Sequence, residues 1–214
     1  ILTVAIVTTP PSNDGPDRIQ QANEGVEKLR KHVDAIIILS NDAINQLYGD
    51  LPVEQSFERA NDVVAFAAKG IAEIITVESA FIRVDFADLK RVMKGSGRAH
   101  MGVASAEGEN RATEAARKSL CSPLLDSNLI SGAKKILLSI SAANVDSISY
   151  KEALEVLKYI QTYASYKDED GVVHQADIIW GASEKPLEDG VLEVVVVATG
   201  FDQDHQDITR PQSI

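Results

Sequence analysis

Two carboxylates stand three residues apart in segment 84–90, where Asp85 and Asp88 open a short helical pattern. If a helix starts here, this spacing places both acids on one face, beside the unpaired N–H groups and partial positive charge of the helix start. Two ionised acids in that place can order a water molecule and a metal ion for chemistry. They can equally cap the helix, and the spacing taken alone favours capping.

A long apolar helix is expected to position this acidic pair. Apolar residues recur at spacings of four and three over 53–77, and the middle of this stretch, 63–68, is apolar nearly all round. Such a helix needs cover on several sides, so it is expected to run between two layers of structure. At the usual rise per residue it would span about 37 Å.

A β-α-β unit precedes the long helix. Residues 2–8 form a β-rich run that ends at Pro10, residues 16–32 show helical spacing, and residues 35–39 form a second buried strand. The connection favours parallel strands and a right-handed crossover. Two strands are too few for an independent doubly wound domain, and neither G-x-G-x-x-G nor G-x-x-x-x-G-K-[ST] occurs. The unit therefore belongs to a larger sheet.

The remaining chain predicts an α+β pattern with a four-stranded mixed sheet. The expected helices span 85–94, 110–120 and 150–163, and the expected strands span 99–105, 134–141, 177–182 and 192–199, with a turn over 186–190 between the last two. Ser149 and Glu152 form the capping-box pattern at the start of the third of these helices. The tail over 202–214 is polar and is expected to fray.

Composition excludes several classes of partner. Lys+Arg number 21 against 32 Asp+Glu, and the resulting net charge of −11 repels a nucleic-acid backbone. No apolar run approaches the ~20 residues that span a bilayer, so direct membrane insertion is not expected. Residues 1–9 lack the features of a signal peptide, and the single Cys121 rules out an internal disulfide, which favours a cytoplasmic location. The four histidines show no metal-ligand spacing, so no metal site is predicted.

Seven short segments carry the motifs of one known family, in that family's order. They are residues 2–10, 40–42, the helix that contains Gly70 and Ile71, and residues 84–88, 108–112, 122–125 and 197–201. Together they span nearly the whole chain and resemble FtsZ, the tubulin-like GTPase of bacterial cell division. The family's Gly-rich phosphate-binding segment, which ends shortly before this Leu2, is absent, as is the C-terminal tail peptide that binds membrane-tethering partners.

The resemblance implies an α/β fold: a β-α-β remnant of a Rossmann-like GTPase domain, a long central helix, then an α+β domain. The implied divisions are 1–52 for the end of the nucleotide-binding domain, 53–78 for the core helix, 79–201 for the C-terminal domain with its synergy loop, and 202–214 for a flexible tail.

The resemblance also assigns a role to the acidic pair. In the family, the synergy loop enters the nucleotide pocket of the next subunit, where its acids position and polarise the attacking water; Asp85 and Asp88 match those acids. Arg83 stands where FtsZ usually carries Asn. It can stabilise developing negative charge, pair with Asp85 and weaken its role, or simply be an exposed arginine.

Five further residues match the family's nucleotide-contacting positions: Asp14, Arg18, Asn41, Phe57 and Asn61. Asp14 replaces the usual Glu, and Asn61 replaces an Asp that can accept from both guanine N1–H and the amino group, whereas Asn accepts only through its carbonyl. Without the resemblance, Phe57 would be read as a core residue and Asn61 as a helix-surface residue.

The function implied is that of a filament-forming GTPase that assembles the cell-division ring, with GTP hydrolysed between head-to-tail subunits. The full-length protein would use GTP and Mg²⁺ and contact division proteins such as FtsA through the absent tail; this chain alone is expected to bind no cofactor and to be inactive. The departures at Arg83, Asp14 and Asn61 keep a second possibility open, a non-hydrolysing assembly or ligand-binding module. A self-contained two-carboxylate hydrolase is disfavoured, because no companion nucleophile is visible.

Overall fold

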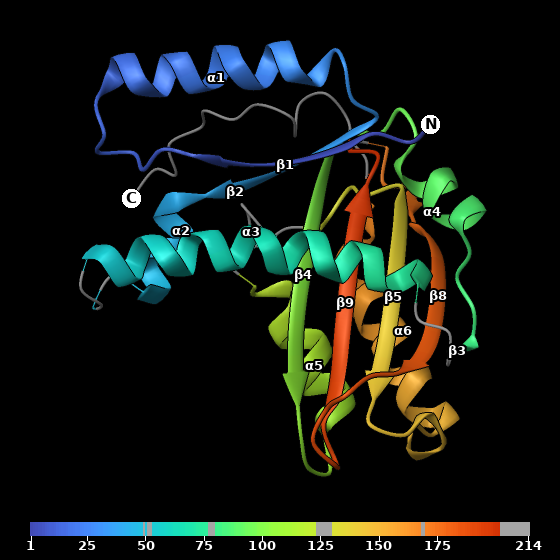
Figure 1. Ribbon diagram of the computed structural model, residues 1–214. Helices are drawn as coiled ribbons and strands as arrows, with labels where there is room; N and C mark the ends of the chain where they lie inside the picture. Colours follow the sequence, from blue (N-terminus) through green and yellow to red (C-terminus); the bar gives the residue numbers. More distant parts are fainter. Residues whose placement is uncertain (49, 51–52, 77–79, 123–129, 168–169, 202–214) are drawn as a thin grey trace.

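The computed structural model describes residues 1–48, 50, 53–76, 80–122, 130–167 and 170–201 (Figure 1). Its strands are β1 (Val4–Thr9), β2 (Ala35–Ser40), β3 (Ala80–Ile82), β4 (Gly97–Ala106), β5 (Lys135–Ala142), β6 (Tyr166–Lys167), β7 (Val173–His174), β8 (Asp177–Glu184) and β9 (Leu192–Thr199). Its helices are α1 (Pro16–Arg30), α2 (Asn41–Tyr48), α3 (Val53–Thr76), α4 (Phe86–Met93), α5 (Arg111–Leu120) and α6 (Tyr150–Ala164), with a short 3-10 helix, η1 (Val145–Ser147).

One mixed, seven-stranded sheet runs through the molecule in the order β1-β2-β4-β9-β5-β8-β3. β1, β2 and β4 are parallel, β9 is antiparallel to both β4 and β5, and β8 is parallel to β5. The predicted α/β class and the β1-α1-β2 unit are confirmed, and the four strands expected in the second half are adjacent. The turn expected between the last two of them does connect β8 to β9, but β5 lies between those strands.

A short seam joins the two parts of the sheet. β2 pairs with β4 through Ala35–Gly97, Ile36–Arg98 and Ile37–Ala99. Strands from the first and third predicted divisions of the chain therefore share one sheet. The division into 1–52, 53–78 and 79–201 stays a prediction, and the tail over 202–214 lies outside the described residues.

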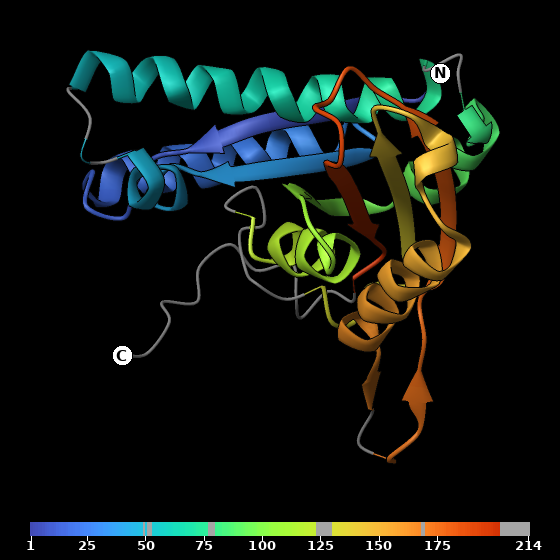
Figure 2. The ribbon, with the colours of Figure 1, turned by 90° about the horizontal axis from the view of Figure 1, so that it is seen from below.

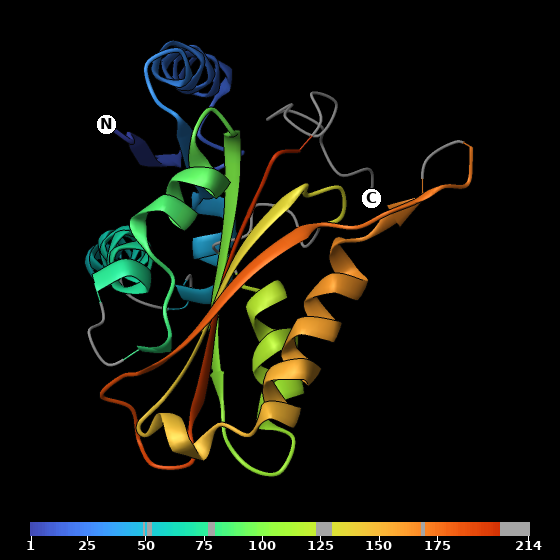
Figure 3. The same cartoon turned by 90° about the vertical axis from the view of Figure 1, so that its right-hand side faces the viewer.

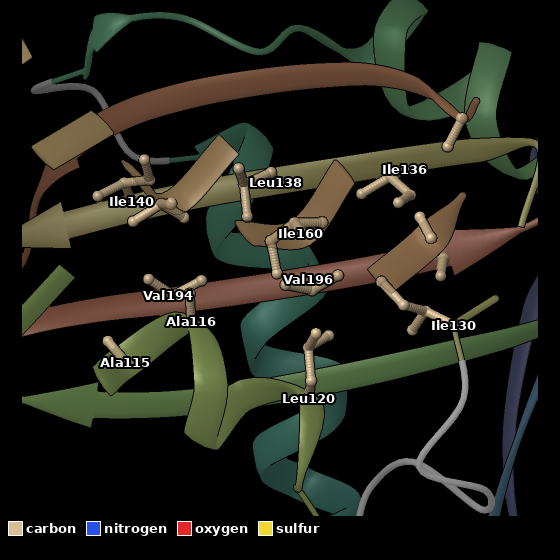
Figure 4. Close-up of a cluster of buried hydrophobic side chains, with 14 of the residues drawn as sticks. Ala115, Ala116, Leu120, Ile130, Ile136, Leu138, Ile140, Ile160, Val194 and Val196 are labelled. Carbon is tan, nitrogen blue, oxygen red and sulfur yellow. The ribbon is translucent and has the colours of Figure 1, made fainter. Parts of the chain in front are cut away.

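The two faces of the sheet bury separate cores, because successive residues of a strand point to opposite sides. Ile136, Leu138 and Ile140 of β5 pack with α5 and α6, as does Val196 of β9 (Figure 4). Leu137 of β5 belongs instead to the cluster under α3 and α4. Figure 3 shows these helix pairs on opposite sides of the sheet. β2, β5 and β9 are buried on both faces, as in a covered sheet, whereas β1 at the edge is only partly buried.

Helix α3 is covered less than the sequence predicts. Ala67 and Ile71 are buried against the sheet, but Phe66 is 48% exposed. Within the described part of the chain, α3 lies on one face of the sheet rather than between two layers (Figure 2). The expectation was wrong on this point because much of the helix's all-round apolarity comes from alanines, including the exposed Ala65 and Ala68, which bury little area.

Candidate functional site

The first candidate group, the strand-end group, comprises Asp14, Arg18 and Asn41 and lies at the carboxyl ends of β1 and β2. Both strands run toward the same edge, where α1, α2 and α3 begin (Figures 1 and 2). Asp14 and Arg18 meet there, with Arg18 Nη1 donating to Asp14 Oδ2 at 2.8 Å. Pro16 begins α1 between them, a position where its missing N–H is not needed. The predicted acid and arginine are thus an ion pair beside the start of a helix.

Asn41 supplies an acceptor that the described residues do not satisfy. It follows β2 directly and starts α2, and its side-chain Oδ1 is buried without a hydrogen-bond partner in the described structure. A buried acceptor left unpaired costs about 1–3 kcal/mol, so such an atom calls for a donor from water or a ligand.

Asp42 holds this strand end in place, a role the sequence analysis missed. Both of its carboxylate oxygens accept from the Ser12 backbone N–H at 3.0 Å, which ties the loop after β1 to the first turn of α2. The partners lie 30 residues apart, so local patterns cannot reveal the contact. The sequence offered one indication of this role: Asp42 is a second polar residue directly beside Asn41, which matches a nucleotide-contacting position of the family.

The remaining two predicted contacts lie on α3. Asn61 is exposed on that helix, as the interpretation without the resemblance predicts. Phe57 belongs to α3, but its side chain lies outside the described structure. Both residues are in the amino-terminal half of α3, which begins at the same edge as the carboxyl ends of β1 and β2 (Figure 1).

The acidic pair forms the second group, and it caps α4. Asp88 N–H donates to Asp85 Oδ1 at 2.9 Å, and Asp85 N–H donates to Asp88 Oδ2 at 3.1 Å. This capping box confirms the structural interpretation of the spacing. The box uses one oxygen of each carboxylate, so the other oxygen of each remains outside it. Capping and a role toward a ligand are therefore compatible.

Packing fixes α4 against the sheet. Leu89, Val92 and Met93 are buried in the cluster beneath α3, and the Thr199 hydroxyl donates to the Val92 carbonyl at 2.9 Å. Arg83, just before the acids, is exposed and forms no ion pair with any described residue. Arg83 therefore does not pair with Asp85, and that role, one of the three considered for Arg83, is removed.

The two groups lie at opposite ends of the molecule. β1, β2 and the start of α3 meet at one side, while the acidic pair follows the far end of α3 (Figures 1 and 2). Since α3 has 24 residues, its length alone is about 36 Å at the usual rise per residue. One copy of the chain cannot bring both groups to the same ligand.

The described residues contain no group of three His, Cys, Asp or Glu side chains placed to hold a metal ion. None of their helices is both long enough and apolar enough to cross a membrane.

The chain is similar to FtsZ proteins in sequence. Residues 97–202 match the family described as FtsZ family, C-terminal domain. The chain is 36% identical over 200 residues to Cell division protein FtsZ 1 of Pyrococcus horikoshii, covering 94% of this chain and 50% of that protein. It is 35% identical over 199 residues to the protein of the same name from Thermococcus kodakarensis, covering 93% and 50%. The chain thus spans about half the length of these relatives.

Solved structures agree with the sequence match. An empty FtsZ dimer from M. jannaschii superimposes with a TM-score of 0.77 at 34% identity, covering 93% of this chain and 55% of that one. A GTPγS-bound protofilament of CetZ2 from Haloferax volcanii gives a TM-score of 0.68 at 18% identity, covering 94% and 57%, which shows a shared fold. The chain therefore belongs to the FtsZ family.

Proposed function

We propose that this chain is part of a filament-forming GTPase of cell division, and that GTP is hydrolysed where two subunits meet. Asp85 and Asp88 of one subunit would position and polarise the attacking water. Asp14, Arg18, Asn41, Phe57 and Asn61 of the next subunit would form part of the nucleotide wall. The complete protein would act in the cytoplasm at the division site, with partners such as FtsA.

The separation of the two groups carries this proposal. A head-to-tail stack apposes opposite ends of successive subunits, and such a heterologous contact that does not close produces an open filament. Stacking would bring the acids at the far end of α3 onto the strand-end group of the next copy. The names of the relatives and the solved protofilament and dimer structures support assembly and cell division as the context.

The chemistry required of this chain is positioning. γ-Phosphate transfer depends mainly on alignment and charge stabilisation, and the oxygens of Asp85 and Asp88 outside the capping box can accept hydrogen bonds from a water. Asn41 Oδ1 can accept from a base or sugar donor. Mg²⁺ usually binds through substrate phosphates and one or two carboxylates, so in the complete protein it would be held largely by the nucleotide.

A mixing experiment tests the shared site in the full-length protein. Asp88→Ala and Asn41→Ala should each lower GTP turnover, Asp88→Ala by about 100-fold. In an equal mixture, one interface in four combines an intact Asn41 with an intact Asp88, so turnover should recover to roughly a quarter of the unmodified rate. Absence of recovery, with both variants still assembling, would contradict a site shared between subunits.

A second function fits one observation. Asp85 and Asp88 already satisfy each other's backbone N–H groups, so α4 needs no ligand to explain them. On that basis the chain would belong to an assembly module that binds nucleotide without hydrolysing it. Unchanged GTP turnover in full-length Asp88→Ala would favour this second function. Asp88→Asn separates the roles, because the amide oxygen can still accept the Asp85 N–H while the negative charge is lost.

A further inference from the structure

An aromatic groove opens at the β3 edge of the sheet. It encloses about 220 Å³ between β3, η1, the first turn of α6 and β8. Three rings line it: Phe81, Tyr150 and Trp180. Phe81 and Tyr150 are 77% and 72% exposed, whereas Trp180 packs partly against the core under α6. The three rings make no ring contact with one another, so the space between them is available to a guest.

A carboxylate gives this groove a chemical preference. Asp146 of η1 also lines it, and its exposed side chain has no hydrogen-bond or ion-pair partner within the described structure. Aromatic faces attract cations through their quadrupole, and a nearby carboxylate adds direct charge attraction. Three aromatic walls with one unpaired acid are suited to a guanidinium or ammonium group.

An anion is the competing guest, because the positive end of the α6 dipole lies at Ser149. That end is already occupied by its own capping box: Glu152 Oε2 accepts from Ser149 N–H at 2.8 Å, and Ser149 Oγ accepts from Glu152 N–H at 3.2 Å. Glu152 also contributes a negative charge in the first turn. With these donors used and Asp146 alongside, the groove disfavours an anion.

The size and place of the groove indicate where the cation comes from. Its volume is below the ~300–1,000 Å³ of pockets that enclose drug-sized ligands, so it fits a single side chain. Ile82 of its wall lies three residues before Asp85, so the groove continues the end of the molecule that carries the acidic pair. Exposed Phe86 extends the apolar surface at that end.

We propose that this groove binds an arginine or lysine side chain of a second copy of the protein. The second-copy assignment rests on the proposed head-to-tail assembly, whereas the preference for a cation rests on the groove alone. The contact would add an anchor to the interface beside the acids. Residues that dominate binding at interfaces are enriched in Trp, Tyr and Arg, which is the combination that this contact would bring together.

Trp180 reports binding directly, since the chain contains a single tryptophan. Capped arginine amide, titrated into the chain, should change Trp180 emission with saturation, while capped glutamine amide should not. Asp146→Asn and Tyr150→Ala should each weaken the arginine response about fivefold. Asp170→Asn, which removes one charge from an exposed site outside the groove, is the matched control and should leave it unchanged. The cation site is overturned if arginine amide changes Trp180 emission equally in the Asp146→Asn variant and the unmodified chain. It is also overturned if the unmodified chain shows no change.

A second arm identifies the source of the cation. In the full-length protein, Asp146→Asn should raise the critical concentration for assembly about fivefold while nucleotide binding to the monomer stays the same. If arginine amide binds but the critical concentration does not move, the second copy is excluded as the occupant. The first arm needs neither GTP nor filaments, so its failure is distinct from failure of the shared GTPase site.

Discussion

At the scale of single residues, folding strongly lowers the pKa of His100. It is 4% exposed in β4, and its ring meets Phe201 edge-on with the centroids 4.8 Å apart. Burial, with a smaller contribution from the charge of Arg98, lowers the pKa of His100 from its usual 6.5 to about 3. The folded protein therefore holds this histidine neutral at pH values where the unfolded chain binds a proton.

This difference predicts acid sensitivity below pH 6.5. Between about pH 6.5 and pH 3 the unfolded state takes up a proton that the folded state refuses, so the free energy of unfolding decreases as the pH falls. At pH 5 the loss from His100 is about 2 kcal/mol relative to pH 7. Urea unfolding at both pH values should show a smaller loss in His100→Phe. His32→Phe, at an exposed histidine, should retain the full loss; equal losses in both variants would contradict the assignment.

At the scale of elements, the period of the apolar residues predicted the larger pieces. α1, α3, α5 and α6 begin within one residue of the expected positions. α2 was not predicted, because Asn41-Asp42 at a strand end looks like a loop until the contact of Asp42 with Ser12 is known. β3 has three residues and owes its strand conformation to β8.

In the candidate site, too, the sequence predicted the local features and missed those that depend on distant parts of the chain. The Asp85–Asp88 capping box depends on residues three apart, so its spacing was enough to predict it. The burial of Asn41 Oδ1 depends on how β1, β2 and α2 meet, and a sequence alone does not contain that geometry.

Another non-local contact ties α3 to the sheet. Lys185, after β8, contacts Glu73 of α3 at 2.9 Å and Glu193 of β9 at 2.6 Å. Burial alone would lower the pKa of Lys185, but the hydrogen bonds and charges of both glutamates outweigh it and raise that pKa. Its side chain is 11% exposed, so this is a largely desolvated cation between two acids.

Removing that cation should cost more than removing an exposed one. Lys185→Met leaves Glu73 and Glu193 without their shared counter-charge and should lower the free energy of unfolding by about 3 kcal/mol. Adding Glu73→Gln and Glu193→Gln to Lys185→Met should recover much of the loss, because no buried charge is then left unpaired. Lys69→Met is the control: Lys69 pairs with Glu73 at 3.5 Å but is 71% exposed, so its loss should cost less than about 1 kcal/mol. If urea unfolding shows the same loss in free energy of unfolding for Lys185→Met and Lys69→Met, the stabilising role of the buried Lys185 ion pairs is refuted.

At the scale of the whole molecule, two unequal parts share one sheet. β4 pairs with β9 over Ala99–Thr199 to Ala106–Leu192, whereas β2 pairs with β4 only from Ala35–Gly97 to Ile37–Ala99. The β1-α1-β2 unit thus depends on a short seam and on the packing of Ile37 and Leu39 beneath α3. The strand-end group lies in this unit and at the start of α2, which follows it directly, whereas the acidic pair is held by α4 on the larger part.

This asymmetry predicts that the smaller part opens first. Two strands are too few to be stable alone, and regions with fewer supporting contacts open at lower free energy than the global transition. In native-state hydrogen exchange, amides of β1 and β2 should open at a free energy about 2 kcal/mol below those of β5 and β9. Ile37→Ala weakens packing that both the local and the global opening break, so it should lower the opening free energy of all four strands equally and leave the gap unchanged. Leu138→Ala, in the core under α6, should instead narrow the gap by lowering the opening free energy of β5 and β9 alone. Equal opening free energies across all four strands would contradict this prediction, because they would mean that both parts of the sheet unfold together despite the short β2–β4 pairing. The strand-end group would then be held as rigidly as the acids that it is proposed to meet.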